Sequence, residues 1–293
     1  MNDFEYSAVA TVEEAVRLLA ARGDRARVLT GGTDLIVQLR EGQRDADLIV
    51  DVKKIPQLMS MEVSSTHGLQ LGAAVACHKI YECPEVAELY PGLADAAKII
   101  GGWQVQSRAS IGGNLCNASP AADSIPMLIA YDVRCRIAGP GGERTVPVAE
   151  FCVAPGKNCL AQGELLVSLD FPMPAPHSSG AYLRFIPRNE MDIAVVGVGA
   201  WVKLSAAGDT IEDARLGVGA VAPTPLFAAE ASQWLKGKPA SDDTFAQAAD
   251  LAKKVSRPIT DKRGPAEYRT HLVGVLTRRA LSIASARASR NNQ

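Results

Sequence analysis

The stretch RVLTGGTDLIVQL (residues 27–39) places two adjacent glycines directly after a short apolar, β-branched run. A second stretch, SRASIGGNLCNASPAADSIP (residues 107–126), repeats this arrangement much later in the chain. Glycine has no Cβ and adopts positive φ at little cost, so paired glycines let a backbone approach a bulky group closely. Successive N–H groups in such a turn form a concave site for an anion.

The two glycine pairs are flanked by neutral donors and by no lysine that is near them in the sequence. A diphosphate held by many amide groups needs no lysine. Taken alone, either pair is typical of an ordinary tight turn; taken together, they predict two loops that grip opposite sides of one diphosphate. The predicted binding residues are Thr30, Gly31, Gly32, Thr33, Asp34 and Leu35 in the first loop, and Ser110, Ile111, Gly112, Gly113 and Asn114 in the second.

A single acid, Asp123, follows the second pair. A carboxylate at such a place accepts hydrogen bonds from ribose hydroxyls, as the acid of dinucleotide sites does. Asp123 also stands where it can cap the helix predicted for SIPMLIAY, and the two roles are compatible. Other nucleotide signatures are absent: GVGAWVKL (197–204) and GVGAVAPTP (217–225) do not continue as GxGxxG, and we interpret their glycines as strand positions where backbones pack closely. The sequence has no P-loop motif.

Composition excludes several classes of protein. The 293 residues are 47% hydrophobic, enough for two domains or one large one. A net charge of −1 gives no basic field for nucleic acid. No apolar run is long enough for a membrane span, and the stretch MNDFEYSAVA does not have the form of a signal peptide, so we expect a cytoplasmic protein without membrane insertion.

The residues that often carry metal or acid–base chemistry show no motif. The six cysteines form no CxxC pair, and we expect reduced thiols that pack as small hydrophobes and hold no metal. The four histidines are scattered, so no catalytic residue is predicted in this chain. Trp103, Trp201 and Trp234 are expected in the core.

The order of predicted elements indicates an α+β protein in two domains. Thr11 and Glu14 form a capping box for a helix over 12–22, and strands at 26–30 and 47–52 complete a small α/β unit. A proline-rich stretch at 172–180 marks a boundary. Further elements are predicted as a strand at 69–75, helical segments over 84–102 broken at Pro91 and Gly92, a hairpin at 133–148, a strand at 164–172, three strands over 180–221, and helices at 226–236, 241–255 and 265–286.

These stretches resemble a known family. VLTGGTDLIVQL and ASIGGNLCNASPAADSIPMLIAYD resemble the two FAD-binding motifs of the medium, flavoprotein subunit of molybdenum hydroxylases, which include the CO dehydrogenase medium subunit and the FAD domain of xanthine dehydrogenase. The likeness continues through GPGGERTVPVAEF, GELLVSLDFP and MDIAVVGVGA, and covers nearly the whole chain. It implies an FAD-binding domain of vanillyl-alcohol-oxidase type over 1–175, with two α/β subdomains split near 55–60, followed by a C-terminal α+β domain over 176–293 with a small antiparallel sheet.

The resemblance also implies roles for residues outside the two loops. Asp123 would hold the ribose or the adjacent phosphate region, Leu166 would lie near the flavin ring, and Tyr182 would contact the ring. Arg184 stands where relatives often carry a lysine near the ring; it keeps the charge but changes its geometry, and a salt bridge at the domain seam is the alternative. Ser110 replaces a commoner threonine and keeps the hydroxyl. No cysteine-rich insertion for a [4Fe–4S] cluster lies between the second loop and Asp123.

The function implied is electron transfer through FAD within a larger complex. A large molybdenum-cofactor subunit would oxidise the organic substrate, and a small [2Fe–2S] subunit would relay electrons to FAD, in a dimer of heterotrimers. Two alternatives stay open. One is a self-contained flavin oxidase with a base near the flavin, and the other is a non-catalytic assembly subunit.

Overall fold

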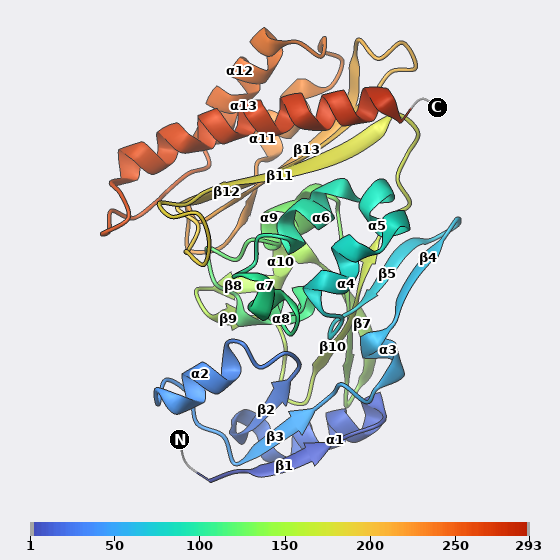
Figure 1. The fold of residues 1–293 in the computed structure, drawn as a ribbon, viewed down its shortest axis with the longest axis vertical. Coiled ribbons are helices and arrows are strands. Elements are labelled where there is room, and N and C mark those ends of the chain that lie inside the picture. The colour runs from blue at the N-terminus through green and yellow to red at the C-terminus, as the bar shows by residue number, and fades with distance from the viewer. Residues whose placement is uncertain (1–2, 292–293) are drawn as a thin grey trace.

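The computed structural model describes residues 3–291, and its three layers follow one another along the longest axis of the molecule (Figure 1). The N-terminal layer is a parallel three-stranded sheet in the order β1-β3-β2. Its elements are β1 (Glu5–Ala8), α1 (Val12–Arg22), the short 3₁₀ helix η1 (Gly23–Arg25), β2 (Ala26–Leu29), α2 (Leu35–Arg40) and β3 (Leu48–Asp51). The helix α1 starts as predicted, because the Thr11 hydroxyl accepts the Glu14 N–H at 3.2 Å.

The middle layer is an antiparallel five-stranded sheet in the order β4-β5-β10-β6-β7, covered by short helices. Its strands are β4 (Met61–Ser64), β5 (Gly68–Gly72), β6 (Arg134–Gly139), β7 (Gly142–Pro147) and β10 (Leu165–Phe171), with a separate hairpin of β8 (Cys152–Ala154) and β9 (Lys157–Asn158). Its helices are α3 (Pro56–Met59), α4 (Cys77–Glu82), α5 (Pro84–Leu89), α6 (Pro91–Ala97), α7 (Trp103–Gln106), α8 (Ile111–Asn117), α9 (Ile125–Ala130) and α10 (Val148–Phe151). The predicted break at Pro91 is present, since this proline begins α6.

The C-terminal layer is an antiparallel sheet with helices on one face (Figure 1). Its elements are β11 (Ser178–Phe185), β12 (Val196–Leu204), β13 (Ile211–Gly219), β14 (Leu226–Phe227), α11 (Ala229–Leu235), α12 (Asp242–Lys253) and α13 (Ala266–Arg290). The predicted helix at 226–236 starts later, because Leu226 and Phe227 pair with β13 as a strand.

The other face of the C-terminal sheet packs against α9 of the middle layer through glycines. A Cβ on Gly199 would lie 2.7 Å from Met127 Cα, and one on Gly217 would lie 2.0 Å from the Pro126 carbonyl oxygen. The interpretation of these residues as strand glycines at a close backbone contact is therefore confirmed. The mixed helix and sheet organisation confirms the predicted α+β class.

One prediction about the core is wrong. Trp103 is 81% exposed, whereas Trp201 is partly buried against the core of the middle layer and Trp234 against that of the C-terminal layer. Trp103 begins the single-turn helix α7, which is too short to pack one face inward along its length. All six cysteines are free thiols. No helix within residues 3–291 has the length and hydropathy needed to cross a bilayer.

Candidate functional site

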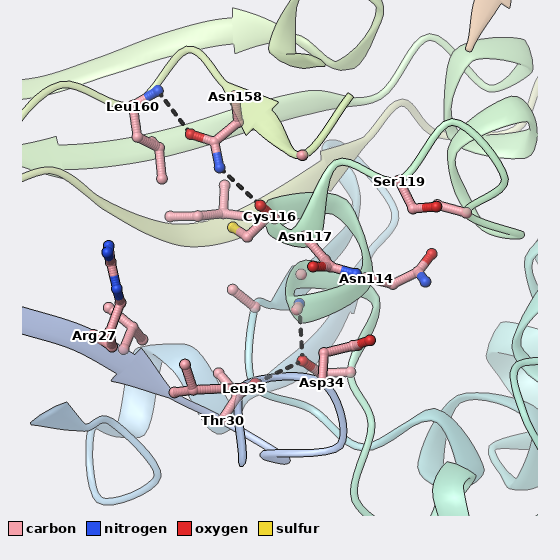
Figure 2. A pocket seen from close by; sticks show the side chains of 18 of the residues that line it. Arg27, Thr30, Asp34, Leu35, Asn114, Cys116, Asn117, Ser119, Asn158 and Leu160 are labelled. Carbon is pink, nitrogen blue, oxygen red and sulfur yellow. Dashed lines mark hydrogen bonds between the residues drawn. The ribbon is translucent and has the colours of Figure 1, made fainter. Parts of the chain in front are cut away.

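A cleft of about 810 Å³ opens between the N-terminal and middle layers, and Figure 2 shows it from close by. It is lined by β2 and the loop that follows, by α8, by β10 and by the β8–β9 hairpin. Most of the predicted binding residues line it: Thr30, Gly32, Thr33, Asp34, Leu35, Ser110, Gly112, Gly113, Asn114, Asp123 and Leu166. Gly31, Ile111, Tyr182 and Arg184 lie outside the lining.

The first glycine pair forms the tight loop that the sequence predicts. Gly32 has a φ of 76°, which a residue with a side chain adopts only under strain. Gly31 is needed for close approach, since a Cβ there would lie 2.0 Å from the Arg108 carbonyl oxygen. Among the described residues, no group accepts a hydrogen bond from the backbone N–H of residues 31–34. The loop therefore presents a run of unpaired donors.

The second glycine pair does not form a loop, contrary to the prediction. Ser110 caps α8 by accepting the Gly113 N–H at 3.0 Å, so Gly112 and Gly113 lie in the first helical turn. The sequence carries this signal, because serine is a preferred N-cap residue. A Cβ on Gly112 would lie 2.4 Å from the Ala73 carbonyl oxygen, so the glycine lets the helix start against the chain that follows β5. The first N–H groups of a helix have no partner within it.

The structure brings the two glycine pairs together. Ser110 Oγ lies 3.4 Å from Thr30 Oγ1. A Cβ on Gly113 would lie 3.1 Å from each of these hydroxyl oxygens. Asn114 accepts two hydrogen bonds from Ser124 on its Oδ1, which leaves its amide N–H₂ group as a donor. Unpaired amides, hydroxyls and bare glycines on facing walls of one cleft fit a diphosphate, as in other backbone anion sites.

Asp123 lies in a buried polar cluster rather than at a helix cap. Tyr182 OH donates to its Oδ1 at 3.2 Å, and Arg184 Nη1 donates to its Oδ2 at 2.7 Å. Ser124, not Asp123, precedes α9, so the capping role is wrong. Burial raises the pKa of Asp123 to about 6, although Arg184 and Tyr182 oppose the shift. Arg184 thus forms the salt bridge at the domain seam that was its alternative role.

The lining of the cleft contains both apolar and charged side chains. Ile100, Val105, Leu166 and Ile193 are apolar, and Arg27 and Arg44 are among the charged residues. The Nε atom of Arg27 is buried and has no hydrogen-bond partner among the residues described. Burial, followed by the charge of Arg44, lowers the pKa of Arg27.

Three side chains of this region are not predicted from the sequence. Gln38 donates to Asn117 Oδ1 at 3.0 Å, which joins α2 to α8 across the cleft. Arg27 precedes the first loop by three positions, and its side chain extends between the layers in Figure 2. Lys53 lies far from both glycine pairs in sequence, yet its Nζ donates to the Thr30 carbonyl oxygen at 3.0 Å. The expectation that no lysine is near the loops holds only along the chain, not in space.

Known proteins match nearly the whole chain. The family described as FAD binding domain in molybdopterin dehydrogenase matches residues 2–174, and the CO dehydrogenase flavoprotein C-terminal domain matches residues 181–284. The chain is 32% identical to a putative xanthine dehydrogenase FAD-binding subunit of Escherichia coli K12, over 98% of both chains. It is also 32% identical to the carbon monoxide dehydrogenase medium chain of Hydrogenophaga pseudoflava, again over 98% of both. A solved Cu,Mo-CO dehydrogenase contains a chain that matches with a TM-score of 0.93 and 29% identity, covering 98% of this chain and 99% of that one.

Proposed function

The chain belongs to the family of FAD-binding subunits of molybdopterin dehydrogenases, and from this premise we propose that it is the electron-transfer flavoprotein subunit of a heteromeric molybdenum-containing hydroxylase. The observation that carries the proposal is the pairing of the two glycine-rich segments in one cleft, with unpaired backbone donors on the first loop. When bound, FAD supplies the ability to accept single electrons and to pass on a pair.

The residues of this chain would hold and orient the cofactor. The loop at residues 30–35 and the start of α8 at 110–114 would bind the diphosphate, with Asp123 near the ribose or phosphate region. Leu166 would contribute an apolar surface near the ring, because it is buried and lines the cleft. Tyr182 and Arg184 lie outside the cleft lining and would act on the cofactor through Asp123, which they both contact. We assign residues 1–175 to the FAD-binding domain and 176–293 to the C-terminal domain.

The partners follow from the family. A large molybdenum-cofactor subunit would oxidise the substrate, and a small [2Fe–2S] subunit would deliver electrons to this chain, in a cytoplasmic dimer of heterotrimers. A related chain is named as a subunit of the 6-hydroxypseudooxynicotine dehydrogenase complex. The self-contained oxidase would need a base such as a histidine, tyrosine or arginine near the flavin ring; no histidine or tyrosine lines the described cleft, and its two arginines, Arg27 and Arg44, both come from the N-terminal layer.

Cofactor content and turnover of the purified chain test the proposal. We expect stoichiometric FAD, seen by its visible absorbance, and no turnover until the partner subunits are added. Gly113→Val should lose FAD, since its side chain enters the lining beside Ser110 and Thr30. Gly141→Ala is the matched control, because a Cβ at this exposed position meets nothing within 4 Å. A folded wild-type chain that takes up no FAD would contradict the proposal, and turnover by the isolated chain would favour the oxidase.

A further inference from the structure

We propose that Lys53 is a positioning residue for the first phosphate-binding loop, an inference that rests on the proposed function. Lys53 follows β3, the central strand of the parallel sheet, and the loop at residues 30–35 follows the neighbouring strand β2. Carboxyl ends of parallel strands meet at one edge of a sheet, where ligands of α/β proteins bind. Lys53 spans from one strand end to the other, since its Nζ donates to the Thr30 carbonyl oxygen at 3.0 Å.

The contact falls on the peptide unit that opens the glycine pair. The Thr30 carbonyl and the Gly31 N–H belong to one planar trans peptide, in which these two groups point in opposite directions. Lys53 lies behind the loop and is not part of the cleft lining. By holding the carbonyl on its own side, Lys53 fixes the Gly31 N–H on the opposite side, as one of the unpaired donors of the loop.

Asp51 holds Lys53 in this position. Lys53 Nζ lies 2.8 Å from Asp51 Oδ1, and the Lys53 backbone N–H donates to the same oxygen at 3.0 Å. Tyr6 OH donates to the other oxygen, Oδ2, at 2.6 Å. Burial acts to raise the pKa of Asp51, but the hydrogen bonds from Lys53 and Tyr6 outweigh it and hold the pKa below its usual value. The lysine is thus paired with an ionised acid, so it orients the loop rather than adding net charge to it.

FAD titration of the apoprotein separates this role from general stability. Lys53→Met keeps the length of the side chain but cannot donate, and should weaken FAD binding by about tenfold or more, as expected for the loss of a hydrogen bond from a charged group. Lys53→Arg, which can still donate to Thr30 and pair with Asp51, should recover most of the affinity. Tyr6→Phe is the matched control: it removes a bond to the same acid but leaves the contact between Lys53 and Thr30, and should bind FAD like the wild type.

The outcomes distinguish this inference from the proposed function. If Gly113→Val binds FAD as tightly as the wild type, the proposed site itself is wrong. If Gly113→Val loses FAD while Lys53→Met binds it normally, the site stands and the role of Lys53 is refuted. An equal loss in Tyr6→Phe and Lys53→Met, with equal falls in the Tm of both apoproteins, would also refute it, because the acid would then act on the whole sheet edge. Should Lys53→Met not fold, Lys53→Gln provides the same comparison with a polar side chain.

Discussion

Arg184 and Asp123 form a buried ion pair, with 2.7 Å between Nη1 and Oδ2, that joins β11 of the C-terminal layer to the segment before α9. Asp123 alone of the two lines the cleft. The pair therefore connects the wall of the cleft to the neighbouring sheet, so a change in the charge of either residue affects both.

The charge of Asp123 gives a pH dependence with a defined sign. Burial raises its folded-state pKa to about 6, whereas an unfolded aspartate titrates at about 4. Between these values the folded state binds a proton that the unfolded state does not, so this group adds stability as the pH falls. The free energy of unfolding of the wild type should rise relative to that of Asp123→Asn between neutral pH and about pH 4, as measured by urea denaturation. A difference that shrinks instead would show that Arg184 keeps the folded pKa below the unfolded one.

Substitutions of the two glycines of α8 should have different effects on thermal stability and FAD content. Gly112→Val should lower the Tm of the apoprotein as well as FAD content, because its side chain meets the Ala73 backbone. Gly113→Val should lose FAD with a smaller fall in Tm, because its neighbours are two hydroxyl groups that can move. Thermal unfolding and FAD absorbance of both variants check this. Equal Tm values for the two variants would contradict the assignment of Gly112 to a backbone contact.

Arg27, which lines the cleft, should contribute to FAD affinity. Three strand residues at about 3.3 Å each place it about 10 Å from Thr30, which suits the adenosine half of a dinucleotide whose diphosphate lies at the loop. Arg27→Met should weaken FAD binding by about tenfold and reduce the dependence of Kd on salt. Arg17→Met, at an exposed position of α1, is the control. Unchanged affinity in Arg27→Met would show that the bound cofactor does not contact Arg27.

The bond between Gln38 and Asn117 should slow cofactor release. It joins the two walls of the cleft, so FAD leaves more easily once the bond is removed. Gln38→Ala and Asn117→Ala should each raise the FAD dissociation rate by about three- to tenfold, and the double variant should add little further, as measured by stopped-flow fluorescence. Gln43→Ala, which loses only an exposed bond to Glu41, serves as the control. Additive effects of the two changes would show that the residues act independently.

The packing of the C-terminal layer against the middle layer should be stabilised by Arg287. Its guanidinium binds both carboxylate oxygens of Asp95 in α6, at 2.6 and 3.1 Å, and the Gly180 carbonyl oxygen at 2.9 Å. Arg287→Met leaves Asp95 without this partner and should lower the free energy of unfolding by about 2 kcal/mol. Arg278→Met, which removes an exposed pair with Asp242, should cost less than about 0.5 kcal/mol. Similar values for both variants in chemical denaturation would show that the seam does not rely on this contact.

The parts of the site that follow from the sequence are those encoded locally. The first glycine pair predicts a turn from the sequence, and the positive φ of Gly32 in the structure agrees with it. The helix that begins at Ile111 is marked by Ser110, but the adjacent glycines, poor helix formers, favour a loop instead. Packing against Ala73 decides the conformation, and that contact is not visible in the sequence.

Contacts between distant segments account for what the sequence does not predict. Lys53 contacts the first loop because β2 and β3 are parallel neighbours whose carboxyl ends lie at one edge of the sheet, so its distance from the glycine pair along the chain says little. Asp123 is identified from its spacing, but its partners Tyr182 and Arg184 come from the next domain. The prediction for Trp103 fails for a different reason. Its large apolar side chain predicts burial, but Trp103 lies on a helix of a single turn and its side chain is exposed.

The close approach of Gly31 to Arg108 has a consequence for biosynthesis. During translation the first loop emerges well before α8, and its neighbour β10 leaves the ribosome later still. A cofactor that needs both segments can bind only once the middle layer has folded, so holoprotein formation would be a late event in the maturation of each newly made chain.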